Sequence, residues 1–305
     1  MTTPLAPLPV GPIGRVVFLG TPDTSADVLS GLLGSGIEVV HVITRADKKR
    51  GRGSTLRPSP VKQMAVDHGV PVSHRVDDLL DLAEPVELGI VVAYGALVRE
   101  HVLVRIPMVN LHFSLLPRWR GAAPIERCIM AGDRETGVCL MHVEVGLDTG
   151  GVLACERVAI DDSVTADELR RDLAERGTRL LVDSLRSGLP PVVPQEGEPV
   201  YAEKLTSDDR HIVWSESADM TMRRVRLGGA WTELEGTRVR IGSLRATDEK
   251  STQRAGEGSV DGSRVMIATG DLDVEIITLQ PEGKTMMSAA DWANGRRGAP
   301  ISFES

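Results

Sequence analysis

Three polar residues that could share one reaction lie in the middle of this chain. Asn110 and His112 are two positions apart, and Asp148 follows further along. On a β-strand, side chains two positions apart leave from the same face, so Asn110 and His112 would point together. Polar groups that are buried together need mutual hydrogen-bond partners, and Asp148 is a candidate third member. An amide, an imidazole and a carboxylate suit a reaction that develops negative charge on oxygen while a proton leaves nitrogen.

Alternating strand and helix patterns in the first half of the chain would position these residues. Short apolar runs predict buried strands at residues 15–19, 37–44, 88–93 and 107–113. Helical spacing predicts helices between them at residues 25–33 and 60–68. The strand at 107–113 would deliver Asn110 and His112 at its carboxyl end, where open α/β sheets bind their ligands.

Asp148 falls in a predicted loop with a glycine at each end. Strands are expected at 137–145 and 151–160, and Gly146 and Gly150 bound the loop between them. Backbone next to glycine can bend to aim a side chain, and loops of this kind often carry functional residues. Helical patterns at 122–131 and 165–187 complete the domain.

After residue 188 the pattern changes. Four prolines crowd the segment that follows, at Pro190, Pro191, Pro194 and Pro199, which is typical of a linker. Beyond residue 207, short strand-like runs alternate with glycine-rich turns, which predicts a small β-barrel. We therefore expect the organisation to be a loose extension (1–14), a catalytic α/β domain with a mostly parallel sheet (15–188), a linker (189–206) and a barrel (207–305).

The net charge of −8, from 35 Lys and Arg against 43 Asp and Glu, argues against a protein that coats nucleic acid in general. Charge is nevertheless clustered. Residues 45–57 contain six basic residues and one acidic residue, with two glycines and no apolar periodicity. This segment is either a solvated loop or a mobile arm that meets phosphates.

Several other chemistries lack their signatures. Gly20-Thr21-Pro22 has one glycine where a dinucleotide fingerprint needs three, and no Walker-type phosphate loop is present. The histidines other than His112 show no metal-ligand spacing, so no metal is expected. Three cysteines, Cys128, Cys139 and Cys155, favour a reducing cytoplasm, with Cys128 and Cys139 as buried packing residues. No apolar run of membrane-spanning length and no signal peptide is present, so we expect no membrane association.

Residues 110–125, NLHFSLLPRWRGAAPI, closely resemble the signature of methionyl-tRNA formyltransferases. Further motifs extend the resemblance in order over about residues 15 to 300: FLGTPD (18–23), GRG (51–53), PSPVK (58–62), VVAYG (91–95), AGDRETGV (131–138), VGLDTG (145–150), YAEKL (201–205) and LQPEGK (279–284).

The resemblance implies a Rossmann-like formyltransferase domain followed by a small, OB-like β-barrel. It also implies formyl transfer from 10-formyltetrahydrofolate to the α-amino group of methionyl initiator tRNA, with no metal. The family's catalytic Asn, His and Asp fall on Asn110, His112 and Asp148. Its folate-contacting segments fall on two runs, Ser114, Leu115, Leu116 and Pro117, and Val91, Val92, Ala93, Tyr94 and Gly95. We expect a monomer.

The resemblance also suggests where tRNA binds. The basic loop matches an insertion that reaches the acceptor stem in the family, which nominates Arg45, Lys48, Lys49, Arg50 and Arg52. Lys48 stands where relatives often carry arginine, so we expect electrostatic contact there and no bidentate base contact. The barrel carries 13 Lys and Arg against 16 Asp and Glu from residue 207 onward, so only one face can bind tRNA. We place that face around Arg223, Arg224 and Arg226, with Arg238 and Arg240.

Two alternatives remain open on the sequence alone. A formyltransferase of the same fold could act on an amino sugar nucleotide, glycinamide ribonucleotide or another small amine, because the Asn, His and Asp trio does not exclude these acceptors. A noncatalytic folate- or RNA-binding protein is the other alternative. The basic loop and the β-rich second domain favour tRNA as the acceptor.

Overall fold

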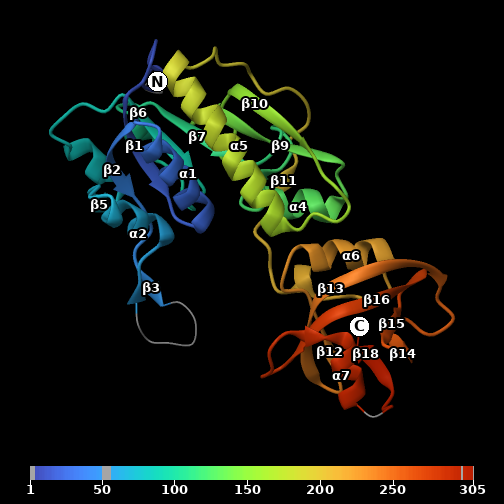
Figure 1. Ribbon diagram of the computed structural model, residues 1–305. Helices are drawn as coiled ribbons and strands as arrows, with labels where there is room; N and C mark the ends of the chain where they lie inside the picture. The colour runs from blue at the N-terminus through green and yellow to red at the C-terminus, as the bar shows by residue number, and fades with distance from the viewer. Residues whose placement is uncertain (1–3, 50–55, 297, 305) are drawn as a thin grey trace. The chain divides into compact units, whose positions relative to one another are not determined.

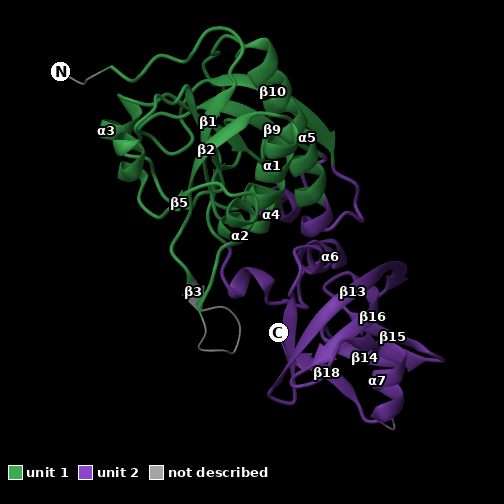
Figure 2. Ribbon diagram, turned by 60° about the vertical axis from the view of Figure 1, so that its left-hand side comes forward, with its two compact units in different colours: residues 1–125, 135–159, 169–204 green, residues 126–134, 160–168, 205–305 purple. Residues whose placement is uncertain are grey.

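The computed structural model describes residues 4–49, 56–296 and 298–304. Its contacts divide the chain into two compact units (Figure 2). The first unit consists of Met1–Ile125, Glu135–Ala159 and Leu169–Lys204, and the second of Glu126–Arg134, Ile160–Glu168 and Leu205–Ser305.

A seven-stranded sheet forms the centre of the first unit (Figure 1). Its spatial order is β10 (Val152–Ala159), β9 (Glu135–His142), β7 (Met108–His112), β6 (Leu88–Val92), β1 (Arg15–Gly20), β2 (Glu38–Ile43) and β5 (Val72–Ser73). Neighbouring strands are parallel from β7 to β5, whereas β9 runs antiparallel to both of its neighbours. The mostly parallel sheet predicted from the sequence is thus confirmed.

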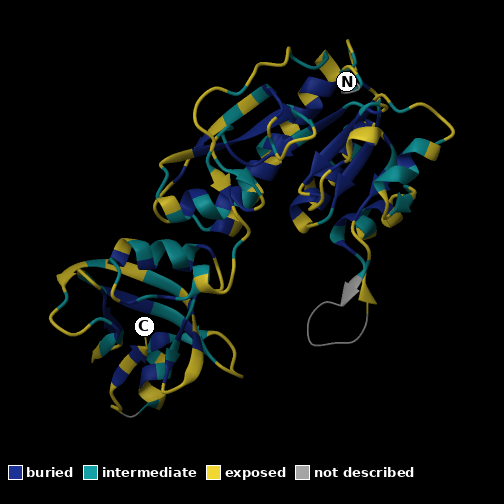
Figure 3. Ribbon diagram, turned by 180° about the vertical axis from the view of Figure 1, so that it is seen from behind, coloured by how far each residue is buried: buried dark blue, intermediate teal, exposed yellow. Residues whose placement is uncertain are grey.

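Helices cover both faces of this sheet. On one face, α5 (Ala166–Ser187) packs so closely on β7 and β9 that a Cβ atom at Gly177 would lie 2.8 Å from Leu111 Cδ2. Helix α1 (Asp23–Gly34) meets α5 at a similarly close contact, between Gly31 and Thr178. The other face carries a separate apolar cluster that includes Val102 and Leu103 of α3 (Glu100–Leu103) and Leu79 of a 3-10 helix (Val76–Asp81). The central strands are therefore buried on both sides (Figure 3).

Helix α2 (Pro60–Asp67) also belongs to the first unit, whereas most of α4 (Pro124–Ala131) is assigned to the second. The strand order reverses between β1 and β6, because the chain first builds outward through β2 and β5 and then returns to the other side of β1. In an open α/β sheet, such a switch point leaves a crevice outside the carboxyl ends of the strands. Gly20 and Val92 are the residues at those ends.

The second unit is a closed antiparallel barrel. Its six strands are β13 (Thr237–Lys250), β12 (Trp231–Leu234), β18 (Ile301–Glu304), β14 (Glu257–Asp261), β15 (Arg264–Ala268) and β16 (Leu272–Pro281), and pairing of β13 with β16 closes it. A short strand β17 (Met287–Ser288) joins β16, and α6 (Ala218–Arg226), α7 (Ala289–Gly295) and a 3-10 turn (Asp208–Arg210) complete the unit. Trp214, stacked on Phe303 in the core, is fully buried. The predicted barrel is confirmed.

Two short strand pairs lie outside these sheets. Strands β3 (Lys48–Lys49) and β4 (Leu56–Arg57) pair at the base of the basic loop. Strands β8 (Arg120–Gly121) and β11 (Tyr201–Ala202) pair in parallel. Val193 also exchanges two backbone hydrogen bonds with Val152, at 2.7 and 2.8 Å. The proline-rich segment that we expected to be a linker is therefore hydrogen-bonded to the first unit at two places.

The expected state of the cysteines is wrong in part. Cys139 on β9 and Cys155 on β10 form a disulfide, because they occupy directly opposed positions of the antiparallel pair with Cα atoms 4.1 Å apart. The sequence places them sixteen residues apart and does not disclose the strand register that brings them together. Cys139 is buried, as expected, and so is Cys128, which forms no disulfide.

Candidate active site

Asn110, His112 and Asp148 come together on one side of the sheet. Leu111 points to helix α5, so the alternation of side chains along β7 directs Asn110 and His112 to the opposite face. The Asn110 amide nitrogen lies 3.4 Å from Asp148 Oδ1, and His112 Nδ1 lies 3.7 Å from Asp148 Oδ2. The His112 and Asp148 side chains are only 6% and 13% exposed. The structure thus assembles the trio that the sequence predicted.

The hydrogen bond made by His112 Nε2 determines which of the two ring nitrogens carries a proton. His112 Nε2 lies 2.9 Å from the backbone oxygen of Trp119. A carbonyl oxygen can only accept, so Nε2 must carry a proton and donate it. Nδ1 is then the nitrogen that faces Asp148.

Backbone around Gly121 holds the Asp148 carboxylate from the other side. The Gly121 N–H donates to Asp148 Oδ2 at 2.8 Å. Gly121 has a φ of +117°, and a Cβ atom there would lie 2.8 Å from the Ala202 carbonyl oxygen. Only glycine satisfies both conditions without strain. Asp148 itself has a φ of +51°, a conformation that Asp tolerates better than most residues.

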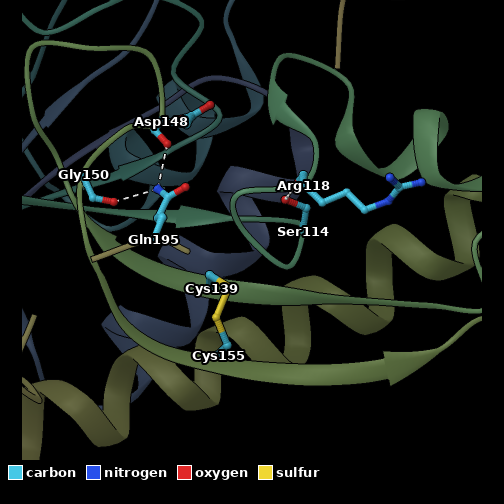
Figure 4. Close-up of a disulfide and its surroundings, with 7 residues drawn as sticks. All are labelled: Ser114, Arg118, Cys139, Asp148, Gly150, Cys155 and Gln195. Atoms are coloured by element: carbon cyan, nitrogen blue, oxygen red, sulfur yellow. Dashed lines mark hydrogen bonds between the residues drawn. A yellow bond between two sulfur atoms is a disulfide. The ribbon is translucent and has the colours of Figure 1, made fainter. Parts of the chain in front are cut away.

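Gln195 and Arg120 also contribute to this site, and neither was predicted as a site residue. The Gln195 side-chain amide donates to the backbone oxygens of Asp148 and Gly150, at 2.9 and 2.7 Å (Figure 4). Its oxygen accepts from Arg120 Nε and Nη2, at 3.1 and 2.7 Å. Gln195 is a single polar residue in a proline-rich segment, and nothing in its sequence surroundings marks it.

The segment from Ser114 to Pro117 follows directly after β7. Ser114 is fully buried, and its hydroxyl donates to the Arg118 backbone oxygen at 2.6 Å (Figure 4). Leu115, Leu116 and Pro117 are partly buried, and Leu115 packs against Gly137 of β9. These contacts fix the backbone of the predicted folate-contacting turn.

The second predicted folate segment, Val91 to Gly95, leaves the end of β6 at the switch point. The Ser25 hydroxyl donates to the Val92 oxygen at 2.7 Å, and the Thr21 hydroxyl donates to the Tyr94 oxygen at 3.1 Å. Ala93 and Gly95 have positive φ angles, so the chain turns sharply here. Burial raises the pKa of the Tyr94 hydroxyl. Val91 to Gly95 therefore lie where the topology predicts a ligand crevice.

The basic loop is only partly described. Arg50 and Arg52 lie outside the described residues, and Lys48 and Lys49 are placed by their backbone in β3. Arg45 and Arg57 are exposed. The one acidic residue of this segment, Asp47, forms an ion pair with Lys62 of α2 at 2.8 Å. That pairing leaves Arg45 and Arg57 as exposed positive charges of the segment.

The predicted arginines of helix α6 all have partners within the second unit. Arg224, only 12% exposed, pairs with Glu216. Arg226 donates to the backbone oxygens of Val164 and Asp161, and burial lowers the pKa of its guanidinium group, which stays charged at neutral pH. Arg223 pairs with Asp219. These contacts occupy much of the hydrogen-bonding capacity of the three side chains.

A cation and two aromatic rings form a different arrangement on the barrel. The Arg238 guanidinium lies 3.7 Å from the centre of the Trp231 ring, and Trp231 also contacts His211 at 4.4 Å between ring centres. Arg238 and its neighbour Arg240 are exposed. Stacked arginine and tryptophan suit contact with a nucleic acid backbone or base.

The described ranges contain no group of three or more His, Cys, Asp or Glu side chains placed to hold a metal ion. Within the same ranges, no helix has the length and apolarity needed to cross a membrane.

Comparison with known families matches both units. The model for the formyl transferase family matches residues 14–185, and the model for the formyl transferase C-terminal domain matches residues 204–297. Among solved structures, HypX from Aquifex aeolicus in complex with tetrahydrofolic acid is similar with a TM-score of 0.64 at 17% identity, over 93% of this chain and 48% of that one. The sugar 3N-formyl transferase WlaRD has a TM-score of 0.63 at 15% identity, over 90% of this chain and 100% of that one. These structural likenesses show the fold alone.

Similarity in sequence is more specific. The methionyl-tRNA formyltransferase of Corynebacterium diphtheriae is 42% identical, over 92% of this chain and 96% of the relative. That of Halorhodospira halophila is also 42% identical, over 94% of this chain and 97% of the relative. This confirms the resemblance that the motifs indicated, and the chain belongs to the methionyl-tRNA formyltransferase family.

Proposed function

We propose that this enzyme transfers the formyl group of 10-formyltetrahydrofolate to the α-amino group of methionine on initiator tRNA, in the cytoplasm. The observation that carries the proposal is the convergence of Asn110, His112 and Asp148 at the end of β7, in a chain of this family. We assign the chemistry to residues 15–188 and tRNA contact to the loop 45–57 together with residues 207–305.

The reaction needs an oxyanion site and a proton path. A neutral amine nitrogen attacks the formyl carbon, and the carbonyl oxygen becomes negatively charged in the tetrahedral intermediate. We assign stabilisation of that oxygen to the Asn110 amide N–H and to His112 Nδ1, both of which lie beside the Asp148 carboxylate. The contacts of Asp148 at 3.4 and 3.7 Å are longer than good hydrogen bonds, which leaves both donors able to turn to substrate.

Proton transfer completes the reaction. The attacking nitrogen loses a proton, which Asp148 receives directly or through water. That proton then passes to the folate nitrogen, and the carbon–nitrogen bond to folate breaks as the oxyanion reforms the carbonyl. Assistance of this kind contributes about 10²–10⁴ in rate. The turn from Ser114 to Pro117 and the segment from Val91 to Gly95 are proposed to hold the folate beside the trio, because both leave carboxyl ends of adjacent strands.

We propose electrostatic contact with tRNA through residues 45–57 and through Arg238, Arg240 and Trp231. The exposure of Arg45, Arg57, Arg238 and Arg240 supports this assignment. Arg223, Arg224 and Arg226 stay in the proposal as sources of positive potential, since their side chains already have protein partners.

A single labelling experiment tests the substrate assignment. Purified enzyme is incubated with 10-formyltetrahydrofolate labelled in the formyl group, and separately with initiator Met-tRNA, elongator Met-tRNA, amino sugar nucleotides and glycinamide ribonucleotide. We expect the label on initiator Met-tRNA, with much slower transfer to the other acceptors. Transfer to small amines alone would overturn the assignment, and no transfer to any acceptor would indicate a binding protein.

A further inference from the structure

Gln195 occupies an unusual position in the chain. Its neighbours from 191 to 194 and from 196 to 199 are exposed, whereas Gln195 is partly buried. It lies between two anchor points, the backbone hydrogen bonds of Val193 with Val152 and the pairing of β11 with β8. The backbone on either side of Gln195 is therefore held against the first unit, and the side chain turns inward toward the Asp148 loop.

Both the nitrogen and the oxygen of the Gln195 side-chain amide make two hydrogen bonds each. The nitrogen has two protons to donate and meets the Asp148 and Gly150 oxygens, while the oxygen accepts twice from Arg120. Carbonyl oxygens on one side and a guanidinium on the other determine the orientation of the amide without ambiguity. Because the loop from Gly146 to Gly150 has no strand pairing of its own, these two hydrogen bonds restrain its backbone.

The same contacts connect the backbone of Asp148 to its side chain through Gln195, Arg120 and Gly121. The Asp148 backbone oxygen is held by Gln195, Gln195 is held by Arg120, and the next residue, Gly121, donates its N–H to the Asp148 carboxylate. Asp148 is thus restrained at both its backbone and its side chain, and Arg120 and Gly121 make the connection. Removal of the Gln195 side chain would break the hydrogen bond to the Asp148 backbone oxygen and leave the contact of Gly121 with the Asp148 carboxylate in place.

We propose that Gln195, together with Arg120, positions Asp148 for proton transfer, so that the proline-rich segment of the first unit contributes to the active site. The inference rests on the proposed function, since it requires Asp148 to act in formyl transfer. It differs from a catalytic assignment, because Gln195 acts only through Asp148. A displacement of about 1 Å in a reacting group can cost about 10²-fold in rate.

The test is a double-mutant cycle with Gln195→Ala and Asp148→Asn, with single-turnover formyl transfer to initiator Met-tRNA as the readout. In the wild-type background we expect Gln195→Ala to lower the rate about 10-fold to 10²-fold, with folate binding affinity unchanged. In the Asp148→Asn background the same substitution should have little further effect, because residues that act as a unit are not additive.

The control is Gln63→Ala. Gln63 also donates its side-chain amide, to Asp67 Oδ1 at 2.9 Å, but does so at the exposed surface of helix α2. It should leave the rate unchanged. Should Gln195→Ala fold poorly, as judged by melting temperature, Arg120→Met breaks the same connection from the other side and should show the same non-additivity with Asp148→Asn.

The possible results distinguish a failure of the positioning role from a failure of the proposed function. Equal losses in both backgrounds, or an unchanged rate for Gln195→Ala in the wild-type background, would overturn the positioning role while leaving formyl transfer intact. Failure of the wild-type enzyme to formylate Met-tRNA would instead overturn the proposed function on which the inference rests.

Discussion

The Asp148 carboxylate and the guanidinium groups of helix α6 differ in how closely their charges are paired. Asp148 meets Asn110 and His112 at 3.4 and 3.7 Å, contacts that are loose enough to exchange for substrate. The Arg226 Nε–H and Nη2–H instead donate to backbone oxygens at 2.8 and 2.9 Å, and Arg224 is paired in a largely buried position. Asp148 thus keeps two long side-chain contacts beside its short one from the Gly121 N–H, whereas Arg224 and Arg226 are closely paired within the fold.

This difference shows that the number of charges in a segment does not measure its capacity to bind a ligand. Arg223, Arg224 and Arg226 form the densest basic cluster of the barrel, yet each has an internal partner. Arg238 has an exposed side chain and stacks on Trp231, so it is the better candidate for phosphate contact. Substitutions of each kind of residue test this difference.

The largest effects are expected at the trio. His112→Ala and Asp148→Asn should each lower the rate of formyl transfer by about 10²–10⁴, because each removes a group that handles charge or a proton in the transition state. Folate binding, followed by fluorescence titration, should be retained. Asp162→Asn is the control, because the Asp162 side chain is 79% exposed and pairs only at the surface. Near wild-type rates in either variant would contradict the assigned roles.

The next effect is expected at Gly121. Alanine at this φ of +117° and 2.8 Å from the Ala202 oxygen should lower the free energy of unfolding by about 1–3 kcal/mol and displace the N–H that binds Asp148. Gly283→Ala, also at positive φ but with no atom near its added Cβ, reports the backbone strain alone. Urea unfolding and the transfer rate are the measurements, and equal behaviour of the two variants would refute the steric argument.

Arg224 and Arg238 should respond in opposite ways. Arg224→Gln leaves Glu216 without its cation and should lower the free energy of unfolding by about 1–3 kcal/mol, with a smaller change in the salt dependence of tRNA binding than Arg238→Gln causes. Arg238→Gln should reduce the slope of log affinity against log salt by about one unit or less, with a stability change within about 1 kcal/mol. The reverse pattern would show that helix α6 forms the tRNA contact.

The smallest effect concerns acid stability of the barrel. The Ala218 N–H, followed by the Leu272 N–H and the Thr269 hydroxyl, holds the pKa of Asp271 below its usual value of 3.8. A depressed folded-state pKa contributes stability that is complete above pH 3.8 and is lost as the pH falls toward the lower folded-state value. Asp271→Asn should therefore destabilise at pH 7 by less than about 1 kcal/mol and flatten the loss of stability below that range. Urea unfolding at several pH values tests this, and an unchanged acid slope would contradict it.

Strand periodicity made much of the fold and the trio predictable. Apolar runs located the parallel strands, and the two-residue spacing of Asn110 and His112 placed both on one face of β7. The partners of the α6 arginines could not be predicted in this way, because helix periodicity does not identify what each face of a helix will contact. Cys139 with Cys155 and Gln195 with Asp148 depend on strand register and on backbone carbonyls, which no side-chain pattern encodes.

The disulfide has a consequence for how the chain near Asp148 can be cut. Cys139 and Cys155 close a covalent ring that contains the whole loop carrying Asp148. A protease that cleaves one peptide bond between residues 140 and 154 would therefore leave a single molecule of unchanged mass apart from one added water. The two pieces would separate on a denaturing gel only after reduction.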